Sequence, residues 1–262
     1  EEFVNTRGVS DIEESTNADV VAFLMELKSK GSSKSTVNRK LASVRTYFTF
    51  LQKRMGLEHN PADNIKSPKI EKKAMEYLKP EEIERLMELP DDTDKGIRDK
   101  AILELLYATG IRASELIDME IADINLRMGF VTCQGENIRA RIIPVGRMAR
   151  NAVEKYMDES RNRLTRSNEE ERHLFVNFQG KPFTRQGLWK VLKEYGDMAG
   201  FSINLTPQVI RNSFAIHMLQ NGADLKSLQE LMGHEDISAT QVYLAFTKNR
   251  IKDVYDRAHP RA

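Results

Sequence analysis

A lysine-rich stretch that disfavours helix divides this chain into two unequal parts. Pro61 and Pro68 disfavour a continuous helix here, and residues 66–73 hold few apolar residues but four lysines, Lys66, Lys69, Lys72 and Lys73. A segment of this composition cannot form part of a hydrophobic core. We therefore expect a domain at residues 1–66, a basic linker at residues 67–76 and a second domain at residues 77–262.

The composition is that of a globular protein, and it excludes several protein classes. A chain of 262 residues suits two domains, and 40% hydrophobic with 30% charged residues is a balance typical of folded proteins. No run of 18 apolar residues predicts a transmembrane helix, and no segment has the order of a signal peptide. A single cysteine, Cys133, excludes a disulfide framework and a multi-cysteine metal site. We expect a cytoplasmic protein with no metal or other cofactor.

The first domain is predicted to be helical and to carry a basic surface. Residues 27–57 hold eight basic residues and no acidic one, although the net charge of the whole chain is only +1. Apolar residues recur in this block at helical spacing and predict one buried face: Val37, Leu41, Val44, Phe48 and Leu51. A second helix is expected at residues 17–30. The basic block fits either a binding surface for a polyanion or an ordinary solvated helix face.

The second domain is predicted to be mainly helical with a small sheet. Helices are expected from Pro80 onward and at residues 99–109, 185–199, 206–221, 225–232 and 238–246. Two short runs rich in β-forming residues, 129–134 and 140–145, flank a polar turn and predict a hairpin, and residues 173–177 are a candidate further strand. The fold class is therefore mainly α with a small β-sheet, as a helical domain followed by an α+β domain.

Three motifs carry polar residues at the ends of these helices. Residues 108–116 (ATGIRASEL) hold Arg112 and Glu115, and residues 206–214 (TPQVIRNSF) hold Arg211. Residues 231–243 begin with LMGH and end with TQVY, which places Tyr243 nine residues after His234. In order and spacing these motifs resemble the tyrosine recombinase, or phage integrase, family, and most closely its Xer (XerD-like) branch. The likeness covers nearly all of the chain.

The resemblance implies an architecture and a set of partners. Family members have an N-terminal helical, SAM-like core-binding domain, usually with one more helix before the point where this chain begins, and a catalytic domain. They bind double-stranded DNA and assemble into dimers and tetramers on it, in some cases with a second recombinase, by exchanging C-terminal segments. Ile251, Val254 and Tyr255 would form the apolar face of that segment here; a tail folded back on its own domain is the alternative.

The resemblance also implies a reaction and roles for named residues. Tyr243 would attack a backbone phosphate and form a 3′-phosphotyrosyl link, with release of a 5′-hydroxyl. Arg112 and Arg211 would bind the non-bridging phosphate oxygens, and Glu115 would position the first arginine. His234 would donate to a phosphate oxygen or assist the nucleophile. Further DNA contacts are expected from basic residues of both domains, namely Lys34, Arg39, Lys40, Arg45, Lys66, Arg139, Arg141 and Arg185.

Two catalytic positions depart from the family pattern. Glu136 stands where the family has a lysine that protonates the leaving oxygen, and a carboxylate there repels the phosphate and carries no proton near neutral pH. Gln208 stands where the family has a histidine; its N–H groups can bind a phosphate oxygen but cannot transfer a proton. Asn212 also replaces a family histidine and is interpreted as a packing change.

Three functions stay open on this sequence. The first is an active site-specific recombinase or mobile-element integrase. The second is a DNA-binding relative or partner subunit with weakened or lost catalysis, which Glu136 and Gln208 favour. The third is a non-enzymatic DNA-binding regulator. Tyr243 in the family register favours the first. The motifs do not specify which DNA sequence is recognised. They also do not distinguish chromosome-dimer resolution from integration or inversion.

Overall fold

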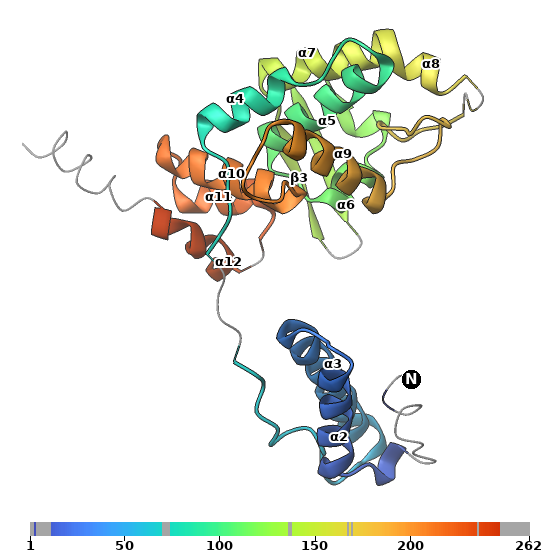
Figure 1. Cartoon of the computed structure of the whole chain (residues 1–262), viewed down its shortest axis with the longest axis vertical. Helices are drawn as coiled ribbons and strands as arrows, with labels where there is room; N and C mark the ends of the chain where they lie inside the picture. Colours follow the sequence, from blue (N-terminus) through green and yellow to red (C-terminus); the bar gives the residue numbers. More distant parts are fainter. Residues whose placement is uncertain are drawn as a thin grey trace, which may run out of the picture. The chain divides into compact units, whose positions relative to one another are not determined.

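A computed structural model describes residue 3 and residues 12–69, 74–135, 138–166, 168, 170–234 and 236–246 (Figure 1). The chain divides into two compact units, residues 1–74 and 75–262, and each unit has a hydrophobic core of its own. None of the helices in the described ranges is long and apolar enough to cross a membrane.

The first unit is built on two packed helices that begin at side-chain caps. A single 3-10 turn, η1 (Ile12–Glu14), precedes α2 (Asn17–Ser29) and α3 (Lys34–Met55). Thr16 caps α2 with a capping box, and the Ser33 hydroxyl accepts from the backbone N–H of Thr36 at the start of α3. The predicted apolar stripe is confirmed, because four of its five members are buried in the core and Val44 packs against it.

Arg45 has a structural task that the sequence did not indicate. Its Nη2 donates to the carbonyl oxygen of Ile65 at 2.8 Å, and its Nε and Nη2 both reach the carbonyl oxygen of Ala62 at 3.3 and 3.2 Å. The Asn60 amide in turn donates to the carbonyl of Arg45 at 3.1 Å. The guanidinium thus fixes the segment that follows α3. The DNA contact expected of Arg45 stays a prediction; in the structure its Nε and Nη2 bind these carbonyls.

The second unit gathers its helices around a short sheet (Figure 1). In chain order its elements are α4 (Pro80–Glu88), α5 (Asp94–Thr109), α6 (Ala113–Asp118), η2 (Ile121–Asp123), β1 (Ile124–Asn125), β2 (Phe130–Gly135), β3 (Ile138–Pro144), α7 (Arg147–Lys155), the π-helical η3 (Tyr156–Arg161), α8 (Asn162–Leu164), α9 (Arg185–Met198), α10 (Pro207–Gln220), α11 (Leu225–Met232), α12 (Ser238–Gln241) and η4 (Val242–Phe246). The helices predicted from periodicity are present, with ends shifted by a few residues; α6, α7 and α8 were not predicted.

The sheet is antiparallel, in the order β1-β2-β3. Val131 pairs with Ile143, and Cys133 pairs with Arg141, so β2 and β3 form the predicted hairpin. The candidate strand at residues 173–177 was wrong. That segment makes only isolated bridges, between Glu120 and His173 and between Val176 and Pro182, because its backbone runs past two separate loops.

Helix α5 is the central element of the second unit and ends where the site begins. Most of its residues are buried, and it packs against α7, η3 and α10. It ends at Gly110, which has a left-handed conformation (φ 58°). A Cβ at this position would come within 2.2 Å of the Phe214 ring on α10. Glycine is therefore required both for the turn and for the close approach of α10.

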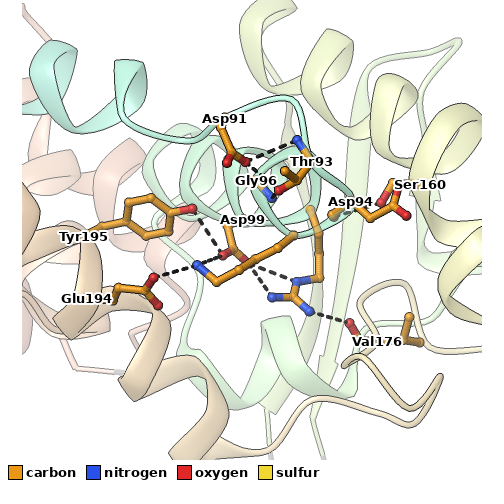
Figure 2. A network of polar contacts seen from close by, with 11 residues as sticks. Asp91, Thr93, Asp94, Gly96, Asp99, Ser160, Val176, Glu194 and Tyr195 are labelled. Carbon is orange, nitrogen blue, oxygen red and sulfur yellow. Dashed lines mark hydrogen bonds and ion pairs between the residues drawn. The ribbon is translucent and has the colours of Figure 1, made fainter.

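A buried ion pair anchors the N-terminal half of α5 (Figure 2). Arg98 donates from Nε and Nη2 to Oδ1 of Asp99, at 2.9 and 2.8 Å, and from Nη1 to the carbonyl of Val176 at 3.3 Å. The hydroxyl of Tyr195 on α9 donates to the other oxygen of Asp99 at 3.2 Å. Both charged side chains are almost fully buried. The network thus connects α5 to α9 and to the loop at Val176.

We predict that Asp99→Asn destabilises the second unit by about 3–5 kcal/mol, because it leaves the Arg98 cation buried without its counter-charge. The measurement is urea unfolding followed by circular dichroism. Asp92→Asn is the matched control, since Asp92 pairs with Lys155 on the exposed surface and its loss should leave the unfolding midpoint unchanged. Equal midpoints for Asp99→Asn and wild type would contradict the prediction.

Candidate active site

The first part of the site is the turn between α5 and α6. Arg112 is the residue that caps α6, and Glu115 lies in its first turn. The backbone N–H of Arg112 donates to Oε2 of Glu115 at 2.7 Å, and its Nη1 donates to Oε1 at 3.1 Å. The pair that the sequence motif predicted is therefore formed locally, by a capping box in which the acid also contacts the arginine head.

A second arginine reaches the same carboxylate from the sheet. Arg141 on β3 donates from Nη1 to Oε1 of Glu115 at 2.7 Å and from Nη2 to Oε2 at 2.8 Å, which is a bidentate pair. Its Nε donates to the carbonyl of Leu231 at 2.9 Å, and only 10% of the side chain is exposed. The DNA contact expected of Arg141 stays a prediction; in the structure its donors bind Glu115 and the Leu231 carbonyl.

Both predicted phosphate-binding arginines donate hydrogen bonds to backbone carbonyls of the turn after α11. Arg112 donates from Nη2 to the carbonyl of Gly233 at 2.8 Å, and Arg211 donates from Nη2 to the carbonyl of Met232 at 2.6 Å. Arg211 also donates to the carbonyl of Gly110. Gly233 has a φ of 61°, and a Cβ there would lie 2.9 Å from the Arg141 guanidinium. This glycine therefore lets the turn pass over Arg141.

Positive charge exceeds negative charge at this turn. Three guanidiniums, of Arg112, Arg141 and Arg211, surround the single carboxylate of Glu115, and Arg211 makes no ion pair with any of the described residues. Burial, and then the nearby Arg112, lower the pKa of Arg211 to about 10. Burial opposes the charge on Glu115, but its bonds to Arg141 and Arg112 outweigh this and lower its pKa. The arrangement is an anion site with two uncompensated charges.

His234 lies against Arg211 as a neutral imidazole. Its Nε2 is 3.0 Å from Nη2 of Arg211, and its Nδ1 is 2.8 Å from the hydroxyl of Thr240. An arginine can only donate, so Nε2 must accept and Nδ1 must carry the proton that is given to Thr240. Burial and the charges of Arg211 and Arg112 lower the pKa of His234 to about 4. In this state it can accept a proton at Nε2 only after Arg211 has moved.

The nucleophile candidate is buried. Tyr243 is 3% exposed and packs in a cluster with Phe214, Leu228 and Met232. Its hydroxyl donates to Oδ1 of Asn212 at 3.2 Å. Burial raises the pKa of Tyr243, and the nearby Arg211 partly offsets this. The phenol is thus close to the anion site but is protonated and bonded to an amide.

Comparisons with known proteins give family matches in both units of the chain. Residues 76–250 match the phage integrase family, and residues 1–55 match the SAM-like N-terminal domain of phage integrases. The chain belongs to the phage integrase family of tyrosine recombinases. Its relatives include the tyrosine recombinase XerD of Oceanobacillus iheyensis, which is 44% identical over 247 residues that cover 94% of this chain and 83% of the relative. The tyrosine recombinase XerC of Roseiflexus castenholzii is 42% identical over 264 residues, or 100% and 84% of the two chains.

Solved structures confirm the expected fold class. The XerH recombinase bound to its palindromic difH substrate gives a TM-score of 0.74 at 20% identity, covering 97% of this chain and 76% of that one. The XerA recombinase gives 0.61 at 24% identity, covering 100% and 89%. The predicted combination of a helical, SAM-like domain with a mainly helical catalytic domain and a small sheet is confirmed.

The remaining predicted residues of this recombinase lie in three settings. Lys34, Arg39, Lys66 and Arg185 are exposed on their helices or, for Lys66, beyond α3. Lys40 is half-buried on α3. Gln208 is the second residue of α10, and its Nε2 donates to Oδ1 of Asn212 at 2.8 Å. Glu136, the side chain of Arg139, and the tail with Ile251, Val254 and Tyr255 lie outside the described residues.

Two residues of the site were missed by the sequence reasoning. Thr240 binds Nδ1 of His234, and Asn212 binds the hydroxyl of Tyr243. Thr240 precedes Tyr243 by three residues within a helical pattern, and this spacing was a usable signal for a shared position. The sequence marked Asn212 only as a replacement of a family histidine and did not indicate its contact with Tyr243, which spans 31 residues.

We predict that His234 titrates near pH 4 in phosphate-free buffer, well below the ordinary histidine pKa of 6.5. The chain has five histidines, so their ring signals can be followed individually by NMR during a pH titration. Arg211→Gln should raise the pKa of His234, because it removes the nearest positive charge. Arg185→Gln is the control, as it removes an exposed arginine and should leave the titration unchanged. A pKa near 6.5 in wild type would contradict the prediction.

The same shift predicts the direction of the pH dependence of stability. Between about pH 4 and the ordinary pKa of 6.5, the unfolded chain binds a proton at His234 and the folded chain does not. The folded state is therefore favoured above pH 6.5 and loses this contribution as the pH falls toward 4. His234→Gln should reduce the fall in urea midpoint between pH 7 and pH 5. A fall as large as that of wild type would show that His234 does not contribute.

Proposed function

We propose that this tyrosine recombinase carries out site-specific recombination of double-stranded DNA, with Tyr243 as nucleophile and Arg112, Arg211 and His234 around the reacting phosphate. The observation that carries the proposal is the uncompensated positive charge at the Gly233 turn. Arg112 and Arg211 converge on consecutive carbonyls there, and the only carboxylate bonded to these guanidiniums in the described structure is shared with Arg141. A phosphodiester that is being transferred from one oxygen to another is the kind of anion that this pair of arginines stabilises.

The proposed reaction exchanges one phosphoester bond for another. The phenolic oxygen of Tyr243 forms a bond to phosphorus while the bond from phosphorus to the 5′-oxygen breaks. The phenol loses its proton, and the departing 5′-oxygen takes one up. A 5′-hydroxyl of a second strand then attacks the phosphotyrosyl link, releases the phenol and restores a DNA backbone. The number of phosphoester bonds stays constant, so the exchange needs no external energy source.

The residues at the family's two proton-handling positions do not supply a general acid for the leaving 5′-oxygen. The family lysine position holds Glu136, and Gln208 cannot carry a proton. Loss of general-acid catalysis typically costs about 100- to 10,000-fold in rate. A second function, a DNA-binding relative or partner subunit with slow catalysis, is favoured by Gln208, whose Nε2 donates to Asn212.

We further propose that the protein assembles on its DNA site. The structure of a lambda integrase dimer on a core site shares the fold, with a TM-score of 0.68 at 16% identity, and covers 92% of this chain and 84% of that one. A dimer or tetramer of this chain, with or without a second recombinase, would join through the C-terminal segment. Such an assembly would act in the cytoplasm, where a chromosome is accessible.

Covalent capture tests the reaction. Wild-type protein is mixed with fragmented, nicked genomic DNA from its source, denatured, and analysed for DNA that stays attached to protein. We expect an adduct that Tyr243→Phe abolishes and that Arg211→Gln lowers by at least about 100-fold, since it removes a donor to the developing charge. Tyr47→Phe, at an exposed tyrosine of the first unit, is the matched control and should leave the yield unchanged.

Glu136→Lys separates the two functions. An adduct from wild type supports the active recombinase, and its DNA identifies the site. If Glu136→Lys forms an adduct and wild type does not, the protein is a DNA-binding relative whose chemistry is limited at the general-acid position. Absence from both contradicts the assignment of Tyr243 as nucleophile.

Binding by α3 gives a separate prediction. Lys34 and Arg39 are exposed on this helix, whereas Arg45 is held by carbonyl groups. Replacing both Lys34 and Arg39 with glutamine should weaken binding to a 30-bp duplex of mixed sequence. It should also reduce the slope of log affinity against log salt concentration by about 0.9 for each lost phosphate contact. The measurement is fluorescence anisotropy between 50 and 200 mM salt. An unchanged slope would show that α3 does not face DNA.

A further inference from the structure

The hydroxyl of Tyr243 makes a single hydrogen bond in the described structure, to the side chain of Asn212 on α10. Oδ1 of Asn212 accepts from the hydroxyl at 3.2 Å and from Nε2 of Gln208 at 2.8 Å. Nδ2 of Asn212 donates to the carbonyl of Glu76 at 2.9 Å. One amide therefore connects the tyrosine, the first turn of α10 and the entry to the second unit.

These contacts fix which way the amide points. The carbonyl of Glu76 can only accept, so the NH₂ group of Asn212 must face it, and Oδ1 must face Gln208 and Tyr243. The Gln208 amide presents its own NH₂ group to that oxygen. It follows that the hydroxyl of Tyr243 is the donor in its bond and directs its proton at an amide carbonyl. An amide is no base, so the phenol in this position keeps its proton.

Asn212 and Arg211 are adjacent on α10, but their side chains point in different directions. Arg211 turns to the Gly110 and Met232 carbonyls and to His234, whereas Asn212 turns to Glu76 and Tyr243. Neighbouring residues on a helix point about 100° apart, so a phenol bonded to Asn212 is held beside the anion site and not on it. The bond to Asn212 must break before the phenolic oxygen can reach a phosphate bound by Arg211.

We propose that Asn212 is a positioning residue that holds Tyr243 in a withdrawn, protonated state, and that Gln208 and Asn212 act together as an amide pair for this purpose. The proposal rests on the role of Tyr243 given above. It joins two of the departures from the family pattern into one device. At these positions, four residues apart on one helix face, two amides replace two imidazoles, and the oxygen of the second amide accepts from both the first amide and the tyrosine.

The chemical reactivity of the Tyr243 phenol in the absence of DNA tests whether Asn212 holds this tyrosine in place. The full chain is treated with N-acetylimidazole, which acetylates accessible phenols, and the modified peptides are quantified by mass spectrometry. In wild type, Tyr243 should react far more slowly than the exposed Tyr47. Asn212→Leu, which removes the amide but keeps a similar volume, should accelerate modification of Tyr243 about fivefold, the effect of losing one net hydrogen bond.

Two controls show whether faster acetylation of Tyr243 in the variant comes from its release by Asn212 or from unfolding of the protein. Tyr156 is fully buried in the main core, so its acetylation should stay slow if the variant is folded. Asn221→Leu makes the same replacement at an exposed position just after α10 and should leave Tyr243 at the wild-type rate. If Asn212→Leu does not fold, Asn212→Ala makes the same test without adding bulk. No selective rise at Tyr243 in the folded variant would overturn the proposal.

Adduct formation tells this proposal apart from the proposed function. On nicked duplex DNA recovered by covalent capture, Asn212→Leu should form the Tyr243 adduct about fivefold faster than wild type, whereas structural damage would slow it. Faster acetylation without an adduct from any form supports the hold and refutes the nucleophile. A Tyr243-dependent adduct from wild type, with unchanged acetylation and an unchanged or lower adduct rate in Asn212→Leu, supports the nucleophile and refutes the hold.

Discussion

The geometry of the site depends on one buried carboxylate, that of Glu115. It accepts from Arg112 within its own helix and from Arg141 on β3, and Arg141 also holds the carbonyl of Leu231 at the end of α11. Three elements far apart in sequence thus meet around two oxygen atoms. Removing this carboxylate would leave three neighbouring guanidiniums without a counter-charge, and an unpaired buried charge costs far more than the pair itself contributes. Glu115 is therefore needed for the site to exist, although it need not touch a substrate.

Arg211 shows what the excess charge means for the protein without DNA. Its pKa is lowered to about 10, so the fold at neutral pH maintains a cation that its surroundings disfavour. An anion that binds between Arg211 and Arg112 relieves this unfavourable energy, and the relief adds to its affinity. The active site is in this sense destabilising until it is occupied, as expected where function rather than stability selects the residues.

Local patterns predicted most of the architecture, and contacts between distant residues set its limits. The apolar stripe of α3, the β2–β3 hairpin and the helix that starts at Pro80 follow from spacing and propensity, and they were found where expected. The side chains of Arg112, Glu115, Arg211 and His234, which the family motifs named, lie around the turn after α11 in the structure, and their roles stay a prediction. Arg45 and Arg141 could not be assigned, because the sequence shows a positive charge but not which carbonyl or carboxylate will take its donors. The task of Asn212 was hidden for the same reason, since its partners lie 31 and 136 residues away.

Thr240 and Tyr243 belong to one short helical segment, and this has a consequence for acid–base chemistry. The hydroxyl of Thr240 accepts the proton that His234 carries on Nδ1, while Nη2 of Arg211 donates to Nε2. A displacement of Tyr243 that carries this segment with it would stretch the bond to Thr240. An imidazole released from Thr240 can rotate away from Arg211, and Nε2 is then open to a proton. Movement of Tyr243 and the hydrogen bonding of His234 are therefore mechanically coupled.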